Sequence, residues 1–345
     1  MTAVLAIRLR ALGDVVLTIP ALRALHLGHG APVDVVTDPR YVELVEDLPY
    51  VRRVFALGRG SFDTLRLIAT LRRERYAVAV DFFGNPRSAW LTAGARASTT
   101  AGYNLRGRGF AYRIRVAREQ SPGPGRREYA AHVHRRLALA AGGRDDGLDA
   151  RLTPTTAALA AADRMLASAG VRDPAHAIAL VAAGTWATKT WPIAHAALLA
   201  RRLVSAGREV VLIEGPGEER LAAWLTTNAP GVVRLPRCGI RELTAVIARL
   251  SALVGTDSGP RHLAAALGRP TYTWFGPTHP DTWTAPDPRH GFWQTSLPCR
   301  ACDRTRCVHW SCLPALDPAI AAAHVLAHLE AFGGNPADFG PAARA

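Results

Sequence analysis

Two short loops carry polar side chains directly after apolar runs, in a pattern that suits phosphate and sugar chemistry. Residues 8–14 end in Asp14 and lead into an apolar stretch, so its carboxylate is either a base at a ligand site or a helix cap. Residues 181–192 place two hydroxyls and one ammonium among small residues, in Thr185, Thr188 and Lys189. Such a loop either cradles a phosphate or is simply solvated.

A third loop, residues 254–262, again joins an apolar run to the start of a predicted helix. Its free amides and the helix dipole favour a diphosphate, although its polar residues could equally be helix caps. The candidates are Asp257, Ser258, Gly259 and His262.

Glu218 follows Gly215-Pro216-Gly217, and it could bind a ribose or merely complement a helix dipole. The third glycine of a dinucleotide fingerprint is missing there, which argues against an NAD site.

Four thiols lie within fourteen residues, at Cys299, Cys302, Cys307 and Cys312. Four thiolates at this spacing could hold one structural Zn or Fe ion, with His309 as a substitute ligand. The alternative is a set of reduced thiols that serve as small apolar residues. A four-cysteine site leaves no open coordination position, so a catalytic metal is not expected here.

The overall charge points to acidic partners. The chain has 345 residues, 42 Lys and Arg against 28 Asp and Glu, and a net charge of +14. Lys189 is the single lysine, so the other basic residues are arginine. Only 7% of the residues are aromatic and they do not alternate with basic residues, so nucleic-acid binding is not expected.

We find no secretion signal or membrane-spanning run, and we expect a cytoplasmic protein.

The elements that must position these residues follow from the alternation of short apolar runs with longer amphipathic stretches. This alternation predicts an α/β protein with parallel strands and crossover helices. We expect strands at residues 4–7, 33–36, 51–55, 78–81, 178–181, 210–213, 232–235, 252–254 and 271–274. Residues 84–125 are expected to form loop with short strands, with helices at 127–141 and 317–332. A linker rich in Gly, Asp and Pro at 142–154 predicts two domains, 1–150 and 151–332, before a flexible tail at 333–345.

These motifs together resemble a known family, the ADP-heptose:lipopolysaccharide heptosyltransferases of glycosyltransferase family 9. The resemblance extends from about residue 3 to about residue 320. It rests on several ordered segments: IRLRALGDVVLTIPALRAL, VDFFGNPRSAWLTAGA, GTWATKTWP, LIEGPGEE, LPRCGI and LVGTDSGPRHLAAALGRPTYTWFGPT. It implies the GT-B fold, in which two Rossmann-like domains face each other across a cleft. The first domain would bind the acceptor and the second the nucleotide-sugar donor.

The resemblance also implies roles for individual residues. By motif position, Asp14 is similar to the family's general base, and Lys189, with Thr185 and Thr188, to its phosphate-binding loop. Glu218 is similar to the ribose carboxylate, and the backbone of Cys238 to the border of the adenine site. The diphosphate and sugar site would comprise Asp257, Ser258, Gly259 and His262. Some related heptosyltransferases hold iron with cysteines.

The activity implied is a metal-independent, inverting transfer of heptose from ADP-L-glycero-β-D-manno-heptose, with no cofactor required for catalysis. The acceptor would be an acidic or lipid-linked glycan such as the lipopolysaccharide inner core, reached at the cytoplasmic face of the inner membrane. Arginines between residues 87 and 127 are the candidate acceptor contacts, above all Arg87, Arg106 and Arg108. The alternatives are another glycan or a small-molecule acceptor, or a noncatalytic protein that binds nucleotides or phosphoglycans.

Overall fold

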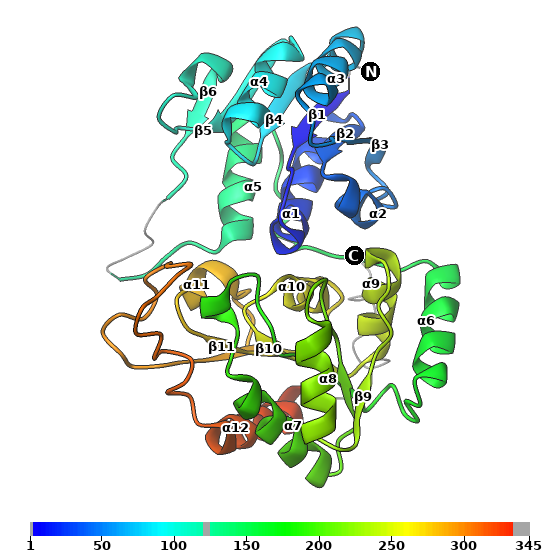
Figure 1. The fold of residues 1–345 in the computed structure, drawn as a ribbon. Helices are drawn as coiled ribbons and strands as arrows, with labels where there is room; N and C mark the ends of the chain where they lie inside the picture. The colour runs from blue at the N-terminus through cyan, green and yellow to red at the C-terminus, as the bar shows by residue number, and fades with distance from the viewer. Residues whose placement is uncertain (1–2, 120–124, 334–345) are drawn as a thin grey trace. The chain divides into compact units, whose positions relative to one another are not determined.

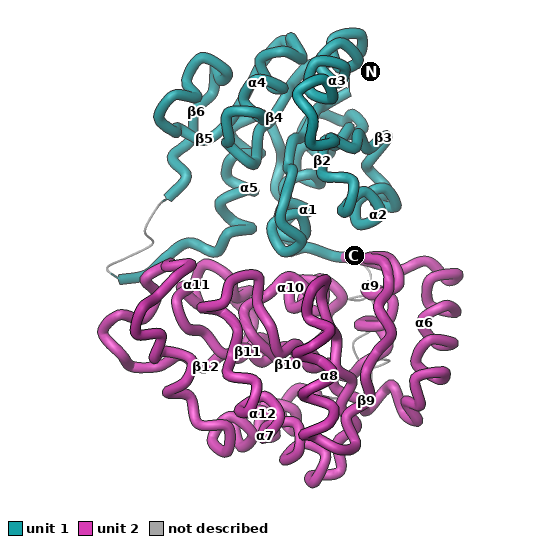
Figure 2. The backbone as a smooth tube through the Cα atoms, viewed as in Figure 1, with its two compact units in different colours: residues 1–151 teal, residues 152–345 magenta. Residues whose placement is uncertain are grey.

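The protein consists of two compact units, residues 1–151 and 152–345, shown in separate colours in Figure 2. The structure is a computed structural model, which describes residues 3–119 and 125–333. The predicted tail, apart from Gly333, lies outside the described residues. Each unit is built around its own parallel sheet, which confirms the predicted α/β class (Figure 1).

Unit 1 contains a six-stranded sheet in the order β3-β2-β1-β4-β5-β6. Its central strands are almost wholly apolar because both faces of a parallel sheet are covered by helices. Helices α1 and α5 pack against each other, as do α3 and α4. The strands are β1 (Val4–Ile7), β2 (Val33–Thr37), β3 (Val51–Ala56), β4 (Val78–Asp81), β5 (Thr99–Tyr103) and β6 (Ile114–Val116). The helices are α1 (Leu12–His29), α2 (Val42–Val45), α3 (Ser61–Arg73), α4 (Pro86–Gly94) and α5 (Ala130–Ala140), with short 3-10 turns η1 (Pro39–Tyr41) and η2 (Gly109–Ala111).

Unit 2 contains a second six-stranded parallel sheet, in the order β12-β11-β10-β7-β8-β9. Counted from β7, this is the same connectivity as in unit 1. The strands are β7 (Ile178–Val181), β8 (Val210–Leu212), β9 (Val232–Arg234), β10 (Ala252–Thr256), β11 (Thr271–Phe275) and β12 (His290–Gln294). The helices are α6 (Thr156–Ser168), α7 (Ile193–Ser205), α8 (Glu219–Asn228), α9 (Ile240–Arg249), α10 (Gly259–Ala266), α11 (Pro280–Trp283) and α12 (Pro318–Phe332), with the 3-10 turn η3 (Ala187–Lys189).

The structure differs from the sequence-based expectation in two places. Residues 84–125 include the helix α4, which begins where the Asn85 side chain accepts a hydrogen bond from the amide of Ser88 at 2.7 Å and Pro86 occupies the first turn. The segment after residue 277 contains the strand β12, paired with β11.

None of the described helices is long and apolar enough to span a membrane.

A glycine allows β10 to approach β7 closely in unit 2. A side chain at Gly255 in β10 would bring its Cβ within 2.3 Å of the carbonyl oxygen of Val181 in β7. The loops that follow these two strands carry Lys189 and Asp257, so the close approach helps to bring those loops together.

Candidate active site

In unit 1, Asp14 lies in the first turn of α1, just beyond the carboxyl end of β1. The cap position is occupied by Ala11, whose amide donates to Asp14 Oδ2 at 3.1 Å. Asp14 therefore performs the helix-capping task, but from within the helix, and its side chain is still a quarter exposed. A capping role and a role at a ligand site are compatible in this geometry.

Arg8 holds the other carboxylate oxygen of Asp14. Its guanidinium forms an ion pair with Asp14 Oδ1 and donates to the carbonyl of Phe82, which follows β4. The same guanidinium lies 5.3 Å from the ring centre of Phe83. Since β1 and β4 are neighbours, both loops emerge at one edge of the sheet, and the buried Arg8 fixes the Asp14 carboxylate there. Arg8 lies in the same sequence motif as Asp14, but its residue type and spacing alone do not assign it to the site.

Of the three candidate acceptor arginines, Arg87 lies in α4, and Arg106 and Arg108 lie in the loop between β5 and η2. Arg87 donates to Thr64 Oγ1 and to the carbonyl of Gly60, both at 2.7 Å, so it ties α4 to α3. Arg108 donates to the carbonyl of Arg106 at 2.8 Å, and the Arg106 side chain is exposed. None of the hydrogen bonds found among the described residues joins these three arginines to Asp14.

In unit 2, Lys189 and Asp257 form the centre of a buried polar cluster. Asp257 Oδ2 accepts hydrogen bonds from Lys189 Nζ and Thr278 Oγ1, each at 2.7 Å, and Oδ1 pairs with Arg261 at 3.2 Å. Burial alone would raise the pKa of Asp257, but the charges of Lys189 and Arg261 lower it to about 2. Asp257 is therefore an anion at neutral pH, and its oxygens hold these two cations in place.

Aromatic rings and one histidine complete this cluster. Lys189 Nζ lies 4.5 Å from the ring centre of Trp186 and 5.7 Å from that of Trp283, so the ammonium also makes cation–π contacts. His262 packs edge-on against Trp283, and burial lowers its pKa to about 3. Because His262 is neutral, the net charge of the cluster is +1, from the cations Lys189 and Arg261 and the anion Asp257.

The first turn of α10 borders the cluster. Ser258 is the N-cap residue and Gly259 begins the helix, so unpaired amides and the positive end of the helix dipole face the loop after β10. The Ser258 Oγ is buried and has no hydrogen-bond partner within the described part of the chain. A helix start beside Lys189 and Arg261 is chemically suited to a diphosphate.

Thr185 and Thr188 of the proposed phosphate loop have different surroundings. Thr185 is exposed, whereas Thr188 is buried and donates to the carbonyl of Arg304 at 2.9 Å. The carbonyl of Thr188 in turn accepts from the indole of Trp310 at 3.3 Å. Thr188 thus anchors η3 to the cysteine-rich segment, and its hydroxyl is engaged within the protein.

Glu218 and Cys238 lie at the starts of α8 and α9. Glu218 occupies the N-cap position of α8 and accepts from the amide of Gly215 at 2.7 Å, while its burial raises its pKa. Cys238 is half-buried, and burial raises the pKa of its thiol to about 11, so the thiol is protonated at neutral pH. No contact among the described residues joins either side chain to the Lys189 cluster.

The four cysteines line one hollow of about 380 Å³, together with His309 and Trp310. Cys299 and Cys302 are exposed, and Cys307 and Cys312 are half-buried. Within residues 3–119 and 125–333, no three His, Cys, Asp or Glu side chains gather closely enough to hold a metal ion. The following segment is ordered by burial, because Leu313 and Leu316 belong to the core of unit 2. A metal at these cysteines therefore stays a prediction.

The sequence analysis missed Arg261, Thr278 and the two tryptophans of the cluster. A signal for Arg261 was present, since Asp257 and Arg261 are four residues apart at a helix start, the spacing of a helical ion pair. Thr278 and Trp283 reach Asp257 and Lys189 from other loops, and no local pattern announces such contacts.

Comparisons with known proteins agree with this geometry. Residues 64–311 match glycosyltransferase family 9 (heptosyltransferase). Lipopolysaccharide heptosyltransferase 1 of Pseudomonas aeruginosa is 29% identical over 320 residues, which cover 89% of this chain and 87% of that protein.

Two solved structures have the same fold. A family 9 glycosyltransferase from Veillonella parvula superposes with a TM-score of 0.80 at 18% identity, over 95% of this chain and 97% of that one. The E. coli ADP-heptose LPS heptosyltransferase II gives a TM-score of 0.78 at 19% identity, over 95% and 99%. The GT-B class expected from the motifs is thereby confirmed.

Proposed function

Because this chain belongs to glycosyltransferase family 9, we propose that it transfers a heptose from ADP-L-glycero-β-D-manno-heptose to a hydroxyl of an acidic glycan such as the lipopolysaccharide inner core. The relative from Pseudomonas aeruginosa is named a lipopolysaccharide heptosyltransferase, and the E. coli neighbour an ADP-heptose enzyme. In this proposal residues 1–150 bind the acceptor and residues 151–332 bind the donor. The observation that carries it is the Lys189–Asp257–Arg261 cluster at the start of α10.

The donor diphosphate would sit at the first turn of α10. Lys189 and Arg261 supply positive charge and the amides of Ser258 and Gly259 supply hydrogen bonds, so charge that develops on the departing ADP is stabilised. Asp257 holds both cations in position and needs no contact with the phosphates. Glu218 would bind the ribose, and the backbone at Cys238 would border the adenine.

Asp14 would act as the general base. As the acceptor oxygen attacks the anomeric carbon from the face opposite the diphosphate, Asp14 takes the hydroxyl proton and ADP leaves, with inversion at that carbon. Arg8 and the amide of Ala11 orient the carboxylate for this step. Arg87, Arg106 and Arg108 would contact acidic groups of the acceptor.

We further propose that catalysis requires no metal, because protein cations serve the diphosphate. Initial rates should then be equal in EDTA and in Mg²⁺. The four cysteines line the same hollow, and they would have to draw closer together than in this structure to bind one structural Zn or Fe ion. Elemental analysis tests this: less than about a tenth of an equivalent of both metals in active protein favours reduced thiols.

The function itself is tested with ADP-heptose and a lipid-linked inner-core acceptor. We expect ADP release that depends on acceptor, and a product that is heavier by one heptose in mass spectrometry. A panel of ADP- and UDP-sugars and of small acceptors identifies the true substrates if this pair fails. Tight ADP binding without turnover on any member of the panel would support the noncatalytic alternative.

A further inference from the structure

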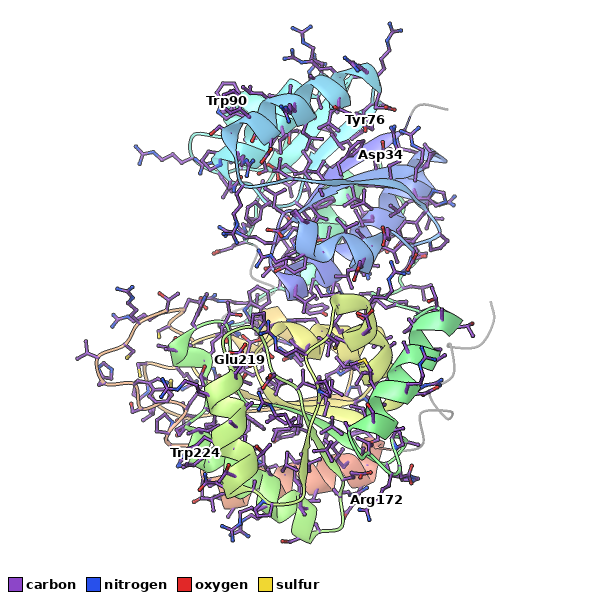
Figure 3. All side chains as sticks on the ribbon, turned by 45° about the vertical axis from the view of Figure 1, so that its right-hand side comes forward. Asp34, Tyr76, Trp90, Arg172, Glu219 and Trp224 are labelled. Carbon is purple, nitrogen blue, oxygen red and sulfur yellow. The ribbon has the colours of Figure 1, made fainter. Side chains whose placement is uncertain are left out.

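Unit 1 exposes large apolar side chains on neighbouring elements. Phe62 and Leu65 of α3, Trp90 of α4 and Phe110 of η2 have exposed fractions of 79%, 64%, 61% and 57%. We call these four residues the apolar face. Figure 1 shows α3 and α4 side by side, and Figure 3 shows Trp90 at the surface of unit 1. In the rest of the described part of unit 1, no large apolar side chain is more than 40% exposed.

A ring contact joins two members of this face, and an arginine links the helix of Trp90 to the helix of Phe62 and Leu65. The rings of Trp90 and Phe110 lie 4.9 Å apart, although their helix and turn are separated along the chain by β5. Arg87 bridges α4 to α3, and Arg115 donates to the carbonyl of Gly109 beside Phe110 at 2.7 Å. Single exposed apolar residues are ordinary on soluble proteins, whereas a group on adjacent elements marks an interaction surface.

The surrounding charge is strongly one-sided. Residues 59–118 contain twelve arginines and three acidic residues. Of the three, Asp81 is buried, Glu74 is paired with Arg53, and Asp63 accepts from the amide of Gly60 at 2.9 Å. The segment that carries the apolar face is therefore strongly cationic. The arginines would repel a second copy of this face. A partner with an apolar interior beneath an anionic surface layer would be complementary to it.

We propose that the α3–α4–η2 surface docks on an anionic lipid bilayer. The four apolar side chains would enter the boundary between headgroups and acyl chains, where aromatic rings are favoured, while the arginines contact lipid phosphates. The inference deepens the proposed function, because a lipid-linked acceptor lies in a membrane. The vesicle-binding measurement uses neither donor nor acceptor, so membrane docking and the proposed transfer reaction can fail separately.

The test is co-sedimentation with vesicles of phosphatidylglycerol and phosphatidylethanolamine, compared with vesicles of phosphatidylcholine alone. We expect wild-type protein to bind the anionic vesicles, and binding to weaken as salt is raised. The double variant Trp90→Ser/Phe110→Ser should bind at least about tenfold more weakly, because two interfacial aromatics are lost. A second double variant, Phe62→Ser/Leu65→Ser, tests α3 independently.

The matched control is Trp224→Ser, which removes a tryptophan of α8 in unit 2 that is 42% exposed (Figure 3). This variant should bind vesicles like wild type. Both double variants should keep the wild-type melting temperature and wild-type turnover of a delipidated acceptor, because the four side chains are outside the proposed site. Unchanged vesicle binding in both double variants would overturn the proposal. So would a concentration-dependent dimer that the same variants abolish, since the face would then join two copies.

Discussion

At the scale of single residues, each proposed catalytic side chain is fixed by a partner that the sequence motif does not reveal. Asp14 is held by Arg8 and by the amide of Ala11, and Lys189 is held by Asp257. The residue types and spacings were sufficient to select Asp14, Lys189 and Asp257 as candidates. They could not identify Thr278 or Trp283, because these contacts depend on how loops meet in the folded chain.

We predict that Asp14→Asn lowers turnover by at least about a hundredfold, because an amide cannot accept the acceptor proton. ADP affinity, measured by calorimetry, should stay within about twofold of wild type, since the proposed nucleotide site is in unit 2. Stability should fall modestly, because the buried Arg8 loses its anionic partner. If the variant melts earlier but retains its specific activity, Asp14 serves the helix alone.

We predict that Lys189→Arg loses most activity, with a raised KM for the donor. The ammonium lies between fixed neighbours: its Nζ is 2.7 Å from Asp257 Oδ2 and 4.5 Å from the ring centre of Trp186. A planar guanidinium is larger and needs a different hydrogen-bond geometry. Arg172→Lys, at an exposed position of the same unit, is the control and should be silent. Full activity of Lys189→Arg would mean that any cation suffices there.

At the scale of elements, the cysteine-rich segment supports the phosphate loop. The turn η3 is held through Thr188, which contacts Arg304 and Trp310, and Trp191 just beyond it donates to the carbonyl of Leu313 at 3.1 Å. A three-residue turn has little stability of its own, so its position depends on these long-range contacts.

We predict that Thr188→Val raises the Kd for ADP about threefold to tenfold, because one buried hydrogen bond to Arg304 is lost and η3 loosens. Thr226→Val is the matched control, since the Thr226 hydroxyl donates within its own helix α8. Equal ADP affinity in both variants, measured by calorimetry, would show that η3 keeps its position without this bond.

The strands were the most predictable elements, and the reason is their burial. Central strands such as β1 and β7 are covered on both faces, so their sequences are short continuous apolar runs. The edge strand β12 carries His290 and Gln294 and lacks this signal. Helix α4 was not predicted because its nine residues are too few to show a clear helical repeat of apolar positions. The segment around it is also rich in glycine and arginine.

At the scale of the whole molecule, both units have the same strand order, and each places a candidate carboxylate after the carboxyl end of a central strand. Asp14 follows β1, and Asp257 follows β10, beside β7. Ligand sites of open parallel sheets lie at this edge, where the strand order reverses. The fold class could therefore be inferred from the alternation, and loop chemistry could supply candidates for the site, whereas the ion pairs required the structure.

Buried neutral histidines make stability depend on pH. Burial lowers the pKa of His262 to about 3 and that of His290 to about 4, whereas both would titrate near 6.5 in the unfolded chain. The unfolded state thus binds more protons below pH 6.5, and the unfolding free energy falls as pH drops from 6.5 toward 4. Each histidine contributes at most about 1.4 kcal/mol per pH unit.

We predict that the urea midpoint of unit 2 is lower at pH 5 than at pH 7, and that the difference shrinks in His290→Gln. Seven of the eight tryptophans lie in unit 2, so tryptophan fluorescence follows its unfolding. Replacing His176, an exposed histidine of the same unit, is the control. A midpoint that is constant between pH 7 and pH 5 would contradict this prediction.

The position of Lys189 also has a consequence for chemical labelling. Apart from the α-amine at the start of the chain, its ammonium is the one primary amine available to acylating reagents. The side chain is 12% exposed and paired with Asp257, so acylation should be slow in the folded protein and fast after unfolding. The acyl group on Lys189, located by peptide mass mapping, thus records the opening of this loop. A bound nucleotide that covers the amine should slow the reaction further.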